Sequence, residues 1–498
     1  MRGLLSVRAA LLAAAMASPL LAVPAVPAAS ASSAAPVPLL PGDPFAGLPS
    51  LTFQQSFALR EAEARALANP AVFAQPYVDV AGTLHAPVTS ADAMGAAATP
   101  IEVPPESAAP DEGTDDLSLV PPPLTGTQKG GSPAAEPVAD PYALPKDPTQ
   151  ARTVTGTGTR EFIPRTRVVR ETWSSLQAIA DQIADLTPAE VPGADKILTT
   201  TVDPRNERVV VEATAVTDAL RTGLGARFGV QNVAIVHITD PGPLLTVEED
   251  AAPAGPVAPQ GTGDRQGDWD PFYGGALIRT NHQGPDRRCT TGFAWRESGM
   301  HYMLTAGHCT SMNYFGWSGA GQPVGQVKHD VFDNGTGSLR VNGHFRGDVS
   351  LIKIFDGSSS WSRVYVGNKN SDKYRQTAGK LPRRAQHGDK FCTGGAFSGE
   401  LCGWKVNGLR ITLEYNGGKR KMKYAARGTK EGKCSMKGDS GAPVYSVNNQ
   451  GKIVPRGVLH GGSGGGSDGI GGDNDPCIVY FTDIDDAHIG LPGTLAVG

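Results

Sequence analysis

Residues 434–444 read CSMKGDSGAPV, a stretch that sets Ser440 between an aspartate and a glycine. A serine hydroxyl is a weak nucleophile until a base takes its proton and hydrogen-bond donors stabilise the oxyanion that its attack creates. Upstream, residues 303–309 read MLTAGHC and contain His308, and imidazole is the most frequent general base in proteins. The two stretches therefore predict that Ser440 is a nucleophile and that His308 is its base.

The residues around Ser440 disfavour two other kinds of serine hydrolase. The nucleophile-elbow pattern GxSxG requires a glycine at the position of Ala442, and its triad runs serine, aspartate, histidine along the chain. A GDSL-type lipase requires a leucine at the position of Gly441. A triad that runs histidine, aspartate, serine fits this chain best.

The third member of such a triad must be one of the aspartates between His308 and the stretch 434–444, at positions 330, 333, 348, 356, 372 and 389. Asp348 directly precedes the apolar run VSLIKI, where a buried carboxylate can orient an imidazole. Asp356 lies in FDGSSS, which is typical of a turn. We predict a triad of His308, Asp348 and Ser440, with the backbone N–H groups of Gly438 and Ser440 as the oxyanion hole.

The cysteines all lie after residue 288 and predict disulfides in an exported protein. Six cysteines allow 15 sets of three pairs, and the spacing of neighbours favours Cys289–Cys309, Cys392–Cys402 and Cys434–Cys477. A zinc site is the alternative, but the chain has no CxxC motif or grouped ladder of His and Cys.

Taken together, MLTAGHC and KGDSGAP resemble the chymotrypsin-like serine proteases, and within them the secreted bacterial alpha-lytic protease and streptogrisin group. The resemblance is strong over 273–498 and weaker over 155–250, where VDPRNERVVVEA is similar to a strand pair of the family's propeptide. It implies an all-β catalytic domain of two six-stranded antiparallel β-barrels, preceded by a small α/β propeptide domain that acts as folding catalyst and inhibitor. It implies no cofactor and no metal.

The resemblance also points to substrate-binding residues. His460, Gly461 and Gly462 match the strand that pairs with the substrate backbone, and His460 replaces the serine that the family usually has there. If His460 lines the pocket and carries charge near neutral pH, we expect cleavage after acidic residues. The half-cystine Cys434 lies six residues before Ser440, so no acidic residue there attracts Lys or Arg substrates, which disfavours trypsin-like specificity.

Asp439 is expected to make a buried ion pair that holds the loop around Ser440. The bacterial relatives often use an arginine directly after the cysteine at 392, but Thr393 stands there in this chain. The partner of Asp439 therefore stays open between another arginine and a new N-terminus.

The chain divides into segments of different composition. Arginines, an Ala-rich apolar run and a closing ASA predict a secretory signal over 1–31. Residues 32–150 are rich in Ala, Pro and acidic residues, which predicts a mostly disordered prosegment with one short helix at FALREAEARALA. Residues 151–250 predict a folded propeptide domain and 251–272 a cleavable linker. Short apolar runs between Gly, Asn and Asp clusters predict the β-rich protease domain over 273–498.

Within the predicted propeptide domain, apolar spacing indicates two helices and three strands. SSLQAIADQIADL and TDALRTGLGARFG have helical character. KILTTTV and RVVVEAT flank the turn DPRNE, and VAIVHIT predicts a further strand.

Charge is distributed unevenly along the chain. Residues 1–264 contain 16 Lys+Arg and 29 Asp+Glu, a net −13, whereas 265–498 contain 29 and 20, a net +9. An acidic prosegment that covers a basic protease explains this asymmetry more simply than nucleic-acid binding does, because no nucleic-acid module is recognisable. The basic run at 419–437 is either a solvated face or a surface that attracts acidic propeptide or acidic substrates.

The glycine-rich segment 461–476 is predicted to be a flexible loop beside the pocket. The alternative is a weak calcium site formed by Asp468, Asp473 and Asp475.

We therefore expect a secreted, extracellular, monomeric serine endopeptidase made as a zymogen, with its own propeptide and protein or peptide substrates as partners. Neither nucleic acid nor membrane is an expected partner. Two alternatives stay open, namely a binding protein on the same fold with vestigial activity, and an esterase that uses the same triad.

Overall fold

The computed structural model describes residues 35–42, 44–45, 51–103, 160–238, 263–281, 287–332, 339–341, 344–380, 384–415, 420–463, 470–471 and 476–498. The predicted signal at 1–31 lies outside the described residues, as do 104–150, 251–262 and the aspartates at 468, 473 and 475. All described residues belong to one unit, 35–498. None of the helices in this part of the chain is long and apolar enough to cross a membrane.

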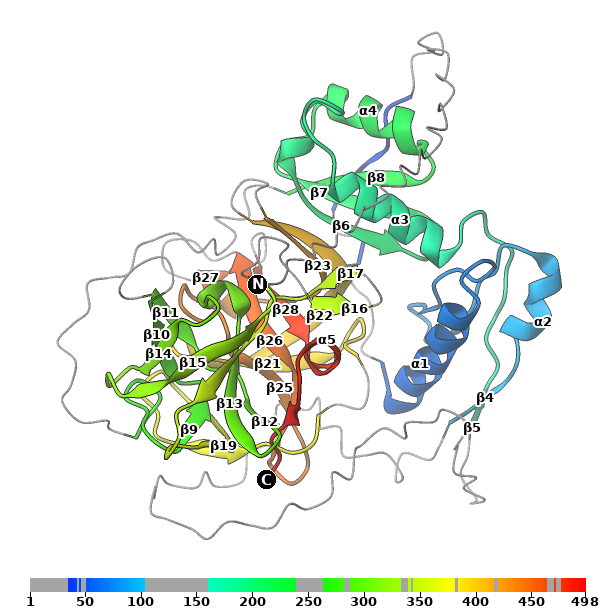
Figure 1. Ribbon diagram of the computed structural model, residues 1–498. Coiled ribbons are helices and arrows are strands. Elements are labelled where there is room, and N and C mark those ends of the chain that lie inside the picture. Colours follow the sequence, from blue (N-terminus) through cyan, green and yellow to red (C-terminus); the bar gives the residue numbers. More distant parts are fainter. Residues whose placement is uncertain are drawn as a thin grey trace, which may run out of the picture. The chain divides into compact units, whose positions relative to one another are not determined.

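Most of the regular structure is β-sheet, as the sequence predicts (Figure 1). One large sheet is antiparallel throughout and has its strands in the order β11 (Arg287–Thr290), β10 (Leu277–Thr280), β14 (Phe315–Ser318), β15 (Pro323–Asp330), β18 (Ser350–Ile354), β13 (Met300–Thr305), β12 (Ala294–Glu297) and β29 (Thr494–Leu495). Alternate residues of these strands, such as Ile278 and Ile352, form a buried apolar cluster, which is the pattern of a sheet with one face on a core.

The second large sheet runs in the order β1 (Leu39–Leu40), β8 (Val233–His237), β7 (Arg208–Ala213), β6 (Ile197–Asp203), β22 (Gly399–Tyr415), β21 (Lys390–Gly395), β25 (Pro443–Val447), β26 (Ile453–Ser463), β28 (Cys477–Asp483) and β23 (Arg420–Lys430). Since β22 also pairs with β23, the last six strands form a closed ring. Phe391 and Trp404 stack within this ring, with their ring centroids 6.2 Å apart.

Smaller sheets complete the β structure. They are β20 (Tyr374–Gln376) with β19 (Ser360–Tyr365) and β9 (Phe272–Gly274), β16 (Leu339–Val341) with β17 (His344–Arg346), β24 (Gly432–Lys433) with β27 (Ile470–Gly471), β2 (Tyr77–Val78) with β3 (Leu84–His85), and β4 (Ile101–Val103) with β5 (Arg160–Phe162). A short helix, α5 (Ile484–Gly490), follows β28.

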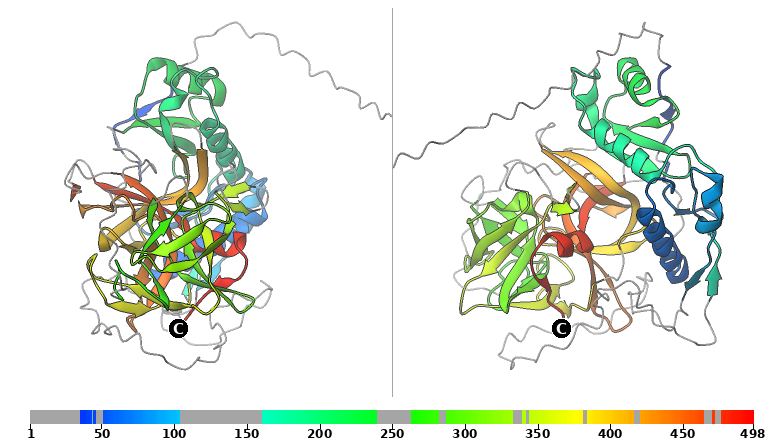
Figure 2. Two further views of the ribbon diagram at one scale, coloured as in Figure 1. Left: turned by 60° about the vertical axis from the view of Figure 1, so that its left-hand side comes forward. Right: turned by 45° about the vertical axis from the view of Figure 1, so that its right-hand side comes forward.

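The helices and strands predicted within 151–250 are present. The helix α3 (Trp173–Ala184) begins where the Thr172 side chain accepts the N–H of Ser175, and α4 (Asp218–Phe228) begins at a similar cap. Figure 2 shows α3 beside the sheet of β6, β7 and β8. One apolar side of α3, which includes Ile183, packs against the buried valines of β7.

The sheet of this α/β unit continues into the ring of six strands. Thr199 and Thr200 of β6 pair with Leu413 and Thr412 of β22, and the hydroxyl of Thr201 donates to the carbonyl of Leu409 at 3.0 Å. The α/β unit and the ring thus share backbone hydrogen bonds across one strand edge.

The expectation that 32–150 is mostly disordered is wrong for 51–103. This segment contains the predicted helix as α1 (Phe53–Ala68), a second short helix α2 (Met94–Ala97) and buried apolar clusters. The composition of 32–150 does not predict this folded segment, because residues later in the chain complete the apolar core of 51–103. Trp173 packs on Phe73 and Ala66, and Phe162 packs on the cluster that contains Val103.

The predicted linker 251–272 also requires correction. Residues from Gly263 onward are packed, and the side chains of Arg265 and Asp268 are 0% and 1% exposed. The packed β-rich part of the chain therefore begins by Gly263 and not at residue 273.

Candidate active site

The positions of His308 and Asp348 follow from the pairing of two neighbouring strands. His308 lies on a single 3₁₀ turn, Gly307–Cys309, just after β13, and Asp348 lies just before β18. Thr305 at the end of β13 pairs with Ser350 at the start of β18. This register brings the two flanking loops together, so that residues 40 positions apart in sequence meet.

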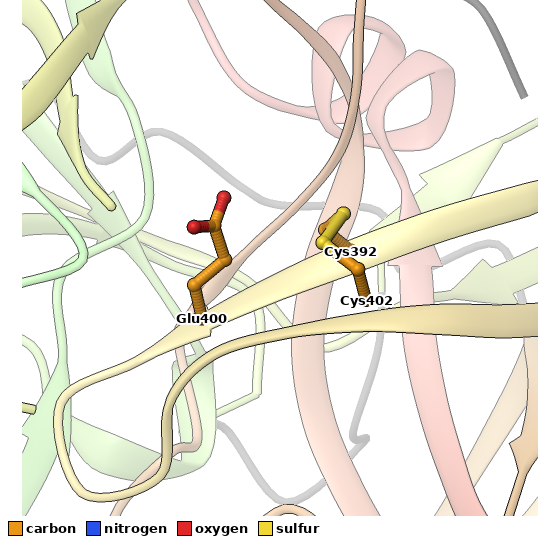
Figure 3. A group of neighbouring side chains, drawn as sticks. All are labelled: Cys392, Glu400 and Cys402. Carbon is orange, nitrogen blue, oxygen red and sulfur yellow. A yellow bond between two sulfur atoms is a disulfide. The ribbon is translucent and has the colours of Figure 1, made fainter. Parts of the chain in front are cut away.

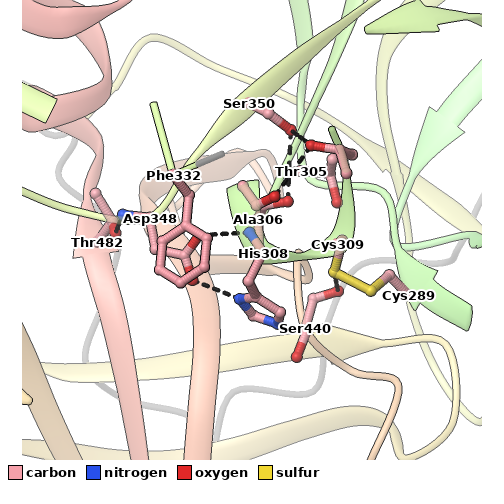
Figure 4. Close-up of polar contacts among 12 residues, drawn as sticks. Cys289, Thr305, Ala306, His308, Cys309, Phe332, Asp348, Ser350, Ser440 and Thr482 are labelled. Carbon is pink, nitrogen blue, oxygen red and sulfur yellow. Dashed lines mark hydrogen bonds and ion pairs between the residues drawn. A yellow bond between two sulfur atoms is a disulfide. The ribbon is translucent and has the colours of Figure 1, made fainter. Parts of the chain in front are cut away.

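The two side chains form a buried, doubly hydrogen-bonded contact (Figure 4). The His308 backbone N–H donates to Oδ1 of Asp348 at 2.8 Å, and Nδ1 of the ring makes a short hydrogen bond with Oδ2. Asp348 is 0% exposed and His308 is 3% exposed. Burial acts to raise the pKa of the Asp348 carboxyl, but the charge and hydrogen bonds of His308 outweigh it and lower that pKa. An ionised Asp348 therefore holds the Nδ1–H tautomer of His308.

A residue that the sequence did not reveal supports this aspartate. The backbone N–H of Asp348 donates to the hydroxyl of Thr482 at 2.8 Å, and Thr482 belongs to β28 in the other large sheet. Nothing in the sequence around Thr482 indicates this contact, because 134 positions separate the two residues.

Ser440 lies on the far side of the imidazole from Asp348. Figure 4 shows the His308 ring between the Asp348 carboxylate and Ser440. The backbone of Ser440 is anchored there, since its carbonyl accepts the N–H of Thr290 at 2.8 Å and lies 3.8 Å from Sγ of Cys309. The structure therefore brings together the three residues of the predicted triad.

Gly438 has the backbone conformation that the loop before Ser440 needs. Its φ is +91°, and a Cβ at this position would meet the Phe397 ring at 2.2 Å, so only glycine is accommodated. Its carbonyl accepts a hydrogen bond from the hydroxyl of Thr290 at 2.8 Å, which anchors the loop.

Within the described part of the chain, backbone N–H groups are the main hydrogen-bond donors to Asp439. Its Oδ1 accepts the N–H groups of Phe397 at 2.9 Å and Ser398 at 3.1 Å, and its Oδ2 accepts that of Met436 at 2.8 Å. Burial raises the pKa of the Asp439 carboxyl, and these N–H groups oppose that effect. The predicted ion pair is thus replaced by a carboxylate that bridges two backbone segments.

His460 lies next to the triad instead of at an open pocket wall. Its side chain is 0% exposed, and its flanking residue Leu459 is bonded to the Ser440 loop through Gly441 N–H (2.7 Å) and Ala442 C=O (2.9 Å). Burial lowers the pKa of His460 to about 4, with the charge of His308 adding to this effect and the charge of Asp348 opposing it. Burial of the ring therefore disfavours the expected charge on His460 near neutral pH.

The two predicted glycines follow on the same strand. Gly461 pairs with Tyr480 and Gly462 with Val479, after a bulge between Leu459 and Gly461. Both glycines are buried.

The other aspartates between His308 and Ser440 that the structure places have different surroundings. Asp330 accepts hydrogen bonds from Thr310 and from the Phe332 N–H, and Asp389 forms a buried ion pair with Arg456 at 3.0 Å. The Asp356 side chain is 99% exposed, as expected for a turn.

The structure joins the three cysteine pairs that the spacing favours, Cys289–Cys309, Cys392–Cys402 and Cys434–Cys477. Figure 3 shows Glu400 beside the Cys392–Cys402 disulfide, an arrangement of possible metal-binding residue types. Disulfide sulfurs supply no thiolate, however, and the Glu400 carboxylate accepts the Tyr445 hydroxyl at 2.7 Å and the Gly367 N–H at 2.9 Å. We therefore assign no metal to this group.

Comparison with known proteins shows similarity to bacterial proteases. The chain is 30% identical over 179 residues to serine protease 2 of Streptomyces fradiae, an alignment that covers 36% of this chain and 88% of that protein. Among solved structures, Thermobifida fusca protease A has 23% identity and a TM-score of 0.34, with 45% of this chain and 98% of that chain covered. A Nocardiopsis protease has 21% identity, the same TM-score and the same coverage. No family model matches the chain.

Proposed function

Because the chain belongs to the chymotrypsin-like serine proteases, in the alpha-lytic protease and streptogrisin-like group, we propose that it is a secreted endopeptidase made as a zymogen. In this proposal Ser440 attacks the scissile carbonyl, His308 accepts its proton and returns it to the leaving amine, and Asp348 holds the tautomer of His308. The N–H groups of Gly438 and Ser440 stabilise the oxyanion, and His460, Gly461 and Gly462 lie on the strand that binds substrate. The closed ring of six strands supports the two-barrel arrangement expected for such an enzyme.

The observation that carries the proposal is the buried His308–Asp348 contact beside Ser440. A buried, ionised carboxylate on one ring nitrogen leaves the other nitrogen as the base, which is the requirement for activating a serine hydroxyl.

The zymogen part of the proposal rests on contacts of the α/β unit. Glu212 of β7 forms a buried ion pair with Arg427 of β23, and Lys423 of the same strand lies 3.6 Å from Asp185 of the unit. The basic strand β23 thus contacts acidic residues of the α/β unit. These contacts support the interpretation that the run at 419–437 attracts acidic propeptide, over that of a purely solvated face.

Labelling with a fluorophosphonate and hydrolysis of casein test the proposal. We expect the chain to be labelled at Ser440 and to hydrolyse casein, and we expect Ser440→Ala to abolish labelling and lower kcat by about 10⁶-fold. The matched control is Ser435→Ala, five positions earlier in the same loop, which should retain both activities.

The two alternatives predict other results. A binding protein with a vestigial site would show neither labelling nor hydrolysis. An esterase would be labelled and would hydrolyse a nitrophenyl ester, but would leave casein intact.

A further inference from the structure

Residues 263–271, which we call the N-terminal arm, precede the first strand of the β-rich part of the chain and yet are held inside it. The Tyr365 hydroxyl lies within hydrogen-bond distance of two acceptors, the carbonyl of Gly263 at 3.0 Å and Oδ1 of Asp268 at 2.8 Å. The other carboxylate oxygen of Asp268 accepts the N–H of Tyr273. These contacts fix both ends of a segment that the sequence suggests is an exposed linker.

Arg265 is the one Lys or Arg of the arm, and its side chain is fully buried. Its Nη1 donates to the carbonyls of Gly275 (3.1 Å) and Gly395 (2.9 Å), and its Nη2 donates to that of Tyr365 (2.7 Å). A fully buried guanidinium loses its hydration, so it is retained only where several acceptors replace water. Burial lowers the pKa of Arg265, and the charges of nearby groups, which include Glu400 and Asp439, oppose that effect.

The next residue of the arm contacts the same loop. Nε2 of Gln266 donates to the carbonyl of Ala396 at 2.5 Å and to that of Lys369 at 3.0 Å. Arg265 and Gln266 therefore hold two successive carbonyls, those of Gly395 and Ala396.

The two residues after those carbonyls hold the loop that contains the nucleophile. The N–H groups of Phe397 and Ser398 donate to Oδ1 of Asp439, the residue directly before Ser440. The Phe397 ring also packs so closely on Gly438 that no Cβ fits there. The conformation of 395–398 thus sets the position of both predicted oxyanion donors.

We propose that Arg265 and Gln266 are positioning residues for the oxyanion loop, and that the activating cut therefore falls before Gly263. The inference rests on the proposed protease function. A cut between Arg265 and residue 273 would remove the hydrogen bonds to the carbonyls of Gly395 and Ala396. The following N–H groups, which hold Asp439, would then lose their fixed position.

N-terminal sequencing of the processed, active protein is the first test. We expect the mature chain to begin at or before Gly263. An active mature chain that begins after Arg265 would overturn the proposal, because it would hold its oxyanion loop without the arm.

Kinetics of full-length variants, processed in the usual way, form the second test. We expect Arg265→Met to lower kcat, normalised to fluorophosphonate-titrated sites, by about 10²–10³-fold with little change in KM. Arg265→Lys should restore part of kcat, since it keeps a charge but not the planar fork. Gln266→Ala removes the hydrogen bond to the Ala396 carbonyl but keeps Arg265, and it should lower kcat by roughly tenfold. If Arg265→Met does not fold, Gln266→Ala is the variant that tests the proposal.

The matched control is Arg375→Met, because Arg375 is also buried and donates to a backbone carbonyl, that of Gly451, at 3.1 Å. It should lower Tm and leave kcat per titrated site unchanged. If Arg265→Met has a lowered Tm but wild-type kcat, the inference is overturned while the proposed function stands. If Arg265→Met does not fold, wild-type kcat in Gln266→Ala overturns it in the same way. A wild-type chain with neither labelling nor hydrolysis would contradict both the inference and the proposed function.

Discussion

At the scale of single residues, two buried histidines of the site differ in what surrounds them. His308 contacts Asp348 through its backbone N–H and through ring Nδ1, and these two hydrogen bonds fix the orientation of the imidazole. His460 is near the same carboxylate, but its complete burial and the neighbouring His308 lower its pKa to about 4. The hydrogen-bonded Asp348 carboxylate thus orients His308 for the role of general base that we propose.

Replacement of Asp348 tests the predicted tautomer. Asp348→Asn keeps the shape but loses the charge that orients Nδ1–H, so we expect kcat to fall by about 10⁴-fold while KM changes little. Asp330→Asn is the matched control, since Asp330 lies in the same region and bonds Thr310 and the Phe332 N–H. Steady-state kinetics on a peptide substrate measure both, and equal losses in the two variants would contradict the assignment.

The lowered pKa of His460 predicts a pH dependence of stability. Its folded-state pKa of about 4 lies below the ordinary 6.5, so between these values the unfolded chain binds a proton that the folded chain does not. The free energy of unfolding therefore decreases as pH falls from about 6.5 to about 4. His387 behaves similarly, because burial lowers its pKa to about 4 as well.

We expect His460→Gln, in the inactive Ser440→Ala background, to reduce proton uptake on unfolding near pH 5 by about one proton. The pH dependence of the denaturation midpoint measures this uptake. His237→Gln, at an exposed position on β8, serves as the control for replacing an imidazole by an amide. An unchanged uptake in His460→Gln would mean that the imidazole is not buried in the folded chain.

At the scale of secondary-structure elements, the edge between β6 and β22 joins the α/β unit to the ring of six strands. The backbone pairs there are Thr200 with Thr412 and Thr199 with Leu413. One buried ion pair, Glu212–Arg427, lies beside them, and the Thr199 hydroxyl donates to the second oxygen of Glu212. Removing one partner of such a pair is costly because the other charge stays buried.

We therefore expect Glu212→Gln to lower the free energy of unfolding of the Ser440→Ala precursor by about 3–5 kcal/mol. The double variant Glu212→Gln/Arg427→Met should recover part of that loss, since it removes the uncompensated cation. Asp218→Asn is the surface control, because its side chain is 95% exposed and its pair with Arg221 contributes little. Chemical denaturation measures all of them. A loss no larger than that of the control would show that the Glu212–Arg427 pair contributes little to holding the two units together.

At the scale of the whole molecule, the chain combines an acidic prosegment with a basic β-rich half. Two pairings of the ring, β21 with β25 and β23 with β28, join segments that are far apart in sequence, and such pairings fold slowly because loop closure precedes the contacts. The hairpin of β6 and β7 is local and offers β22 a formed edge, which makes the α/β unit suited to assist folding.

Refolding tests this role. After denaturation with disulfides intact, we expect the full Ser440→Ala chain to regain native tryptophan fluorescence and circular dichroism, whereas residues 263–498 alone regain little on the same timescale. Rapid and complete recovery by 263–498 would leave the α/β unit as an inhibitor or a spacer.

Local sequence determined much of this protein. The patterns around His308, Asp348 and Ser440, the spacing of the cysteines and the apolar periodicity of α3, β6 and β7 all depend on residues close together in the chain. Such patterns are legible because capping, strand alternation and the short cysteine spacings act over few residues.

Other features were decided only by the tertiary structure. The sequence predicts that Arg265 belongs to a polar linker. Its role depends on the carbonyls of Gly275, Tyr365 and Gly395, which accept its hydrogen bonds only in the folded chain. His460 reads as a pocket residue, but packing buries it beside Asp348 and lowers its pKa. The packing of 51–103 depends on Phe162 and Trp173, which follow much later in the sequence. In each case the deciding partner is distant in sequence, and burial, which sets both the cost of a charge and the gain of an apolar contact, exists only once those partners are assembled.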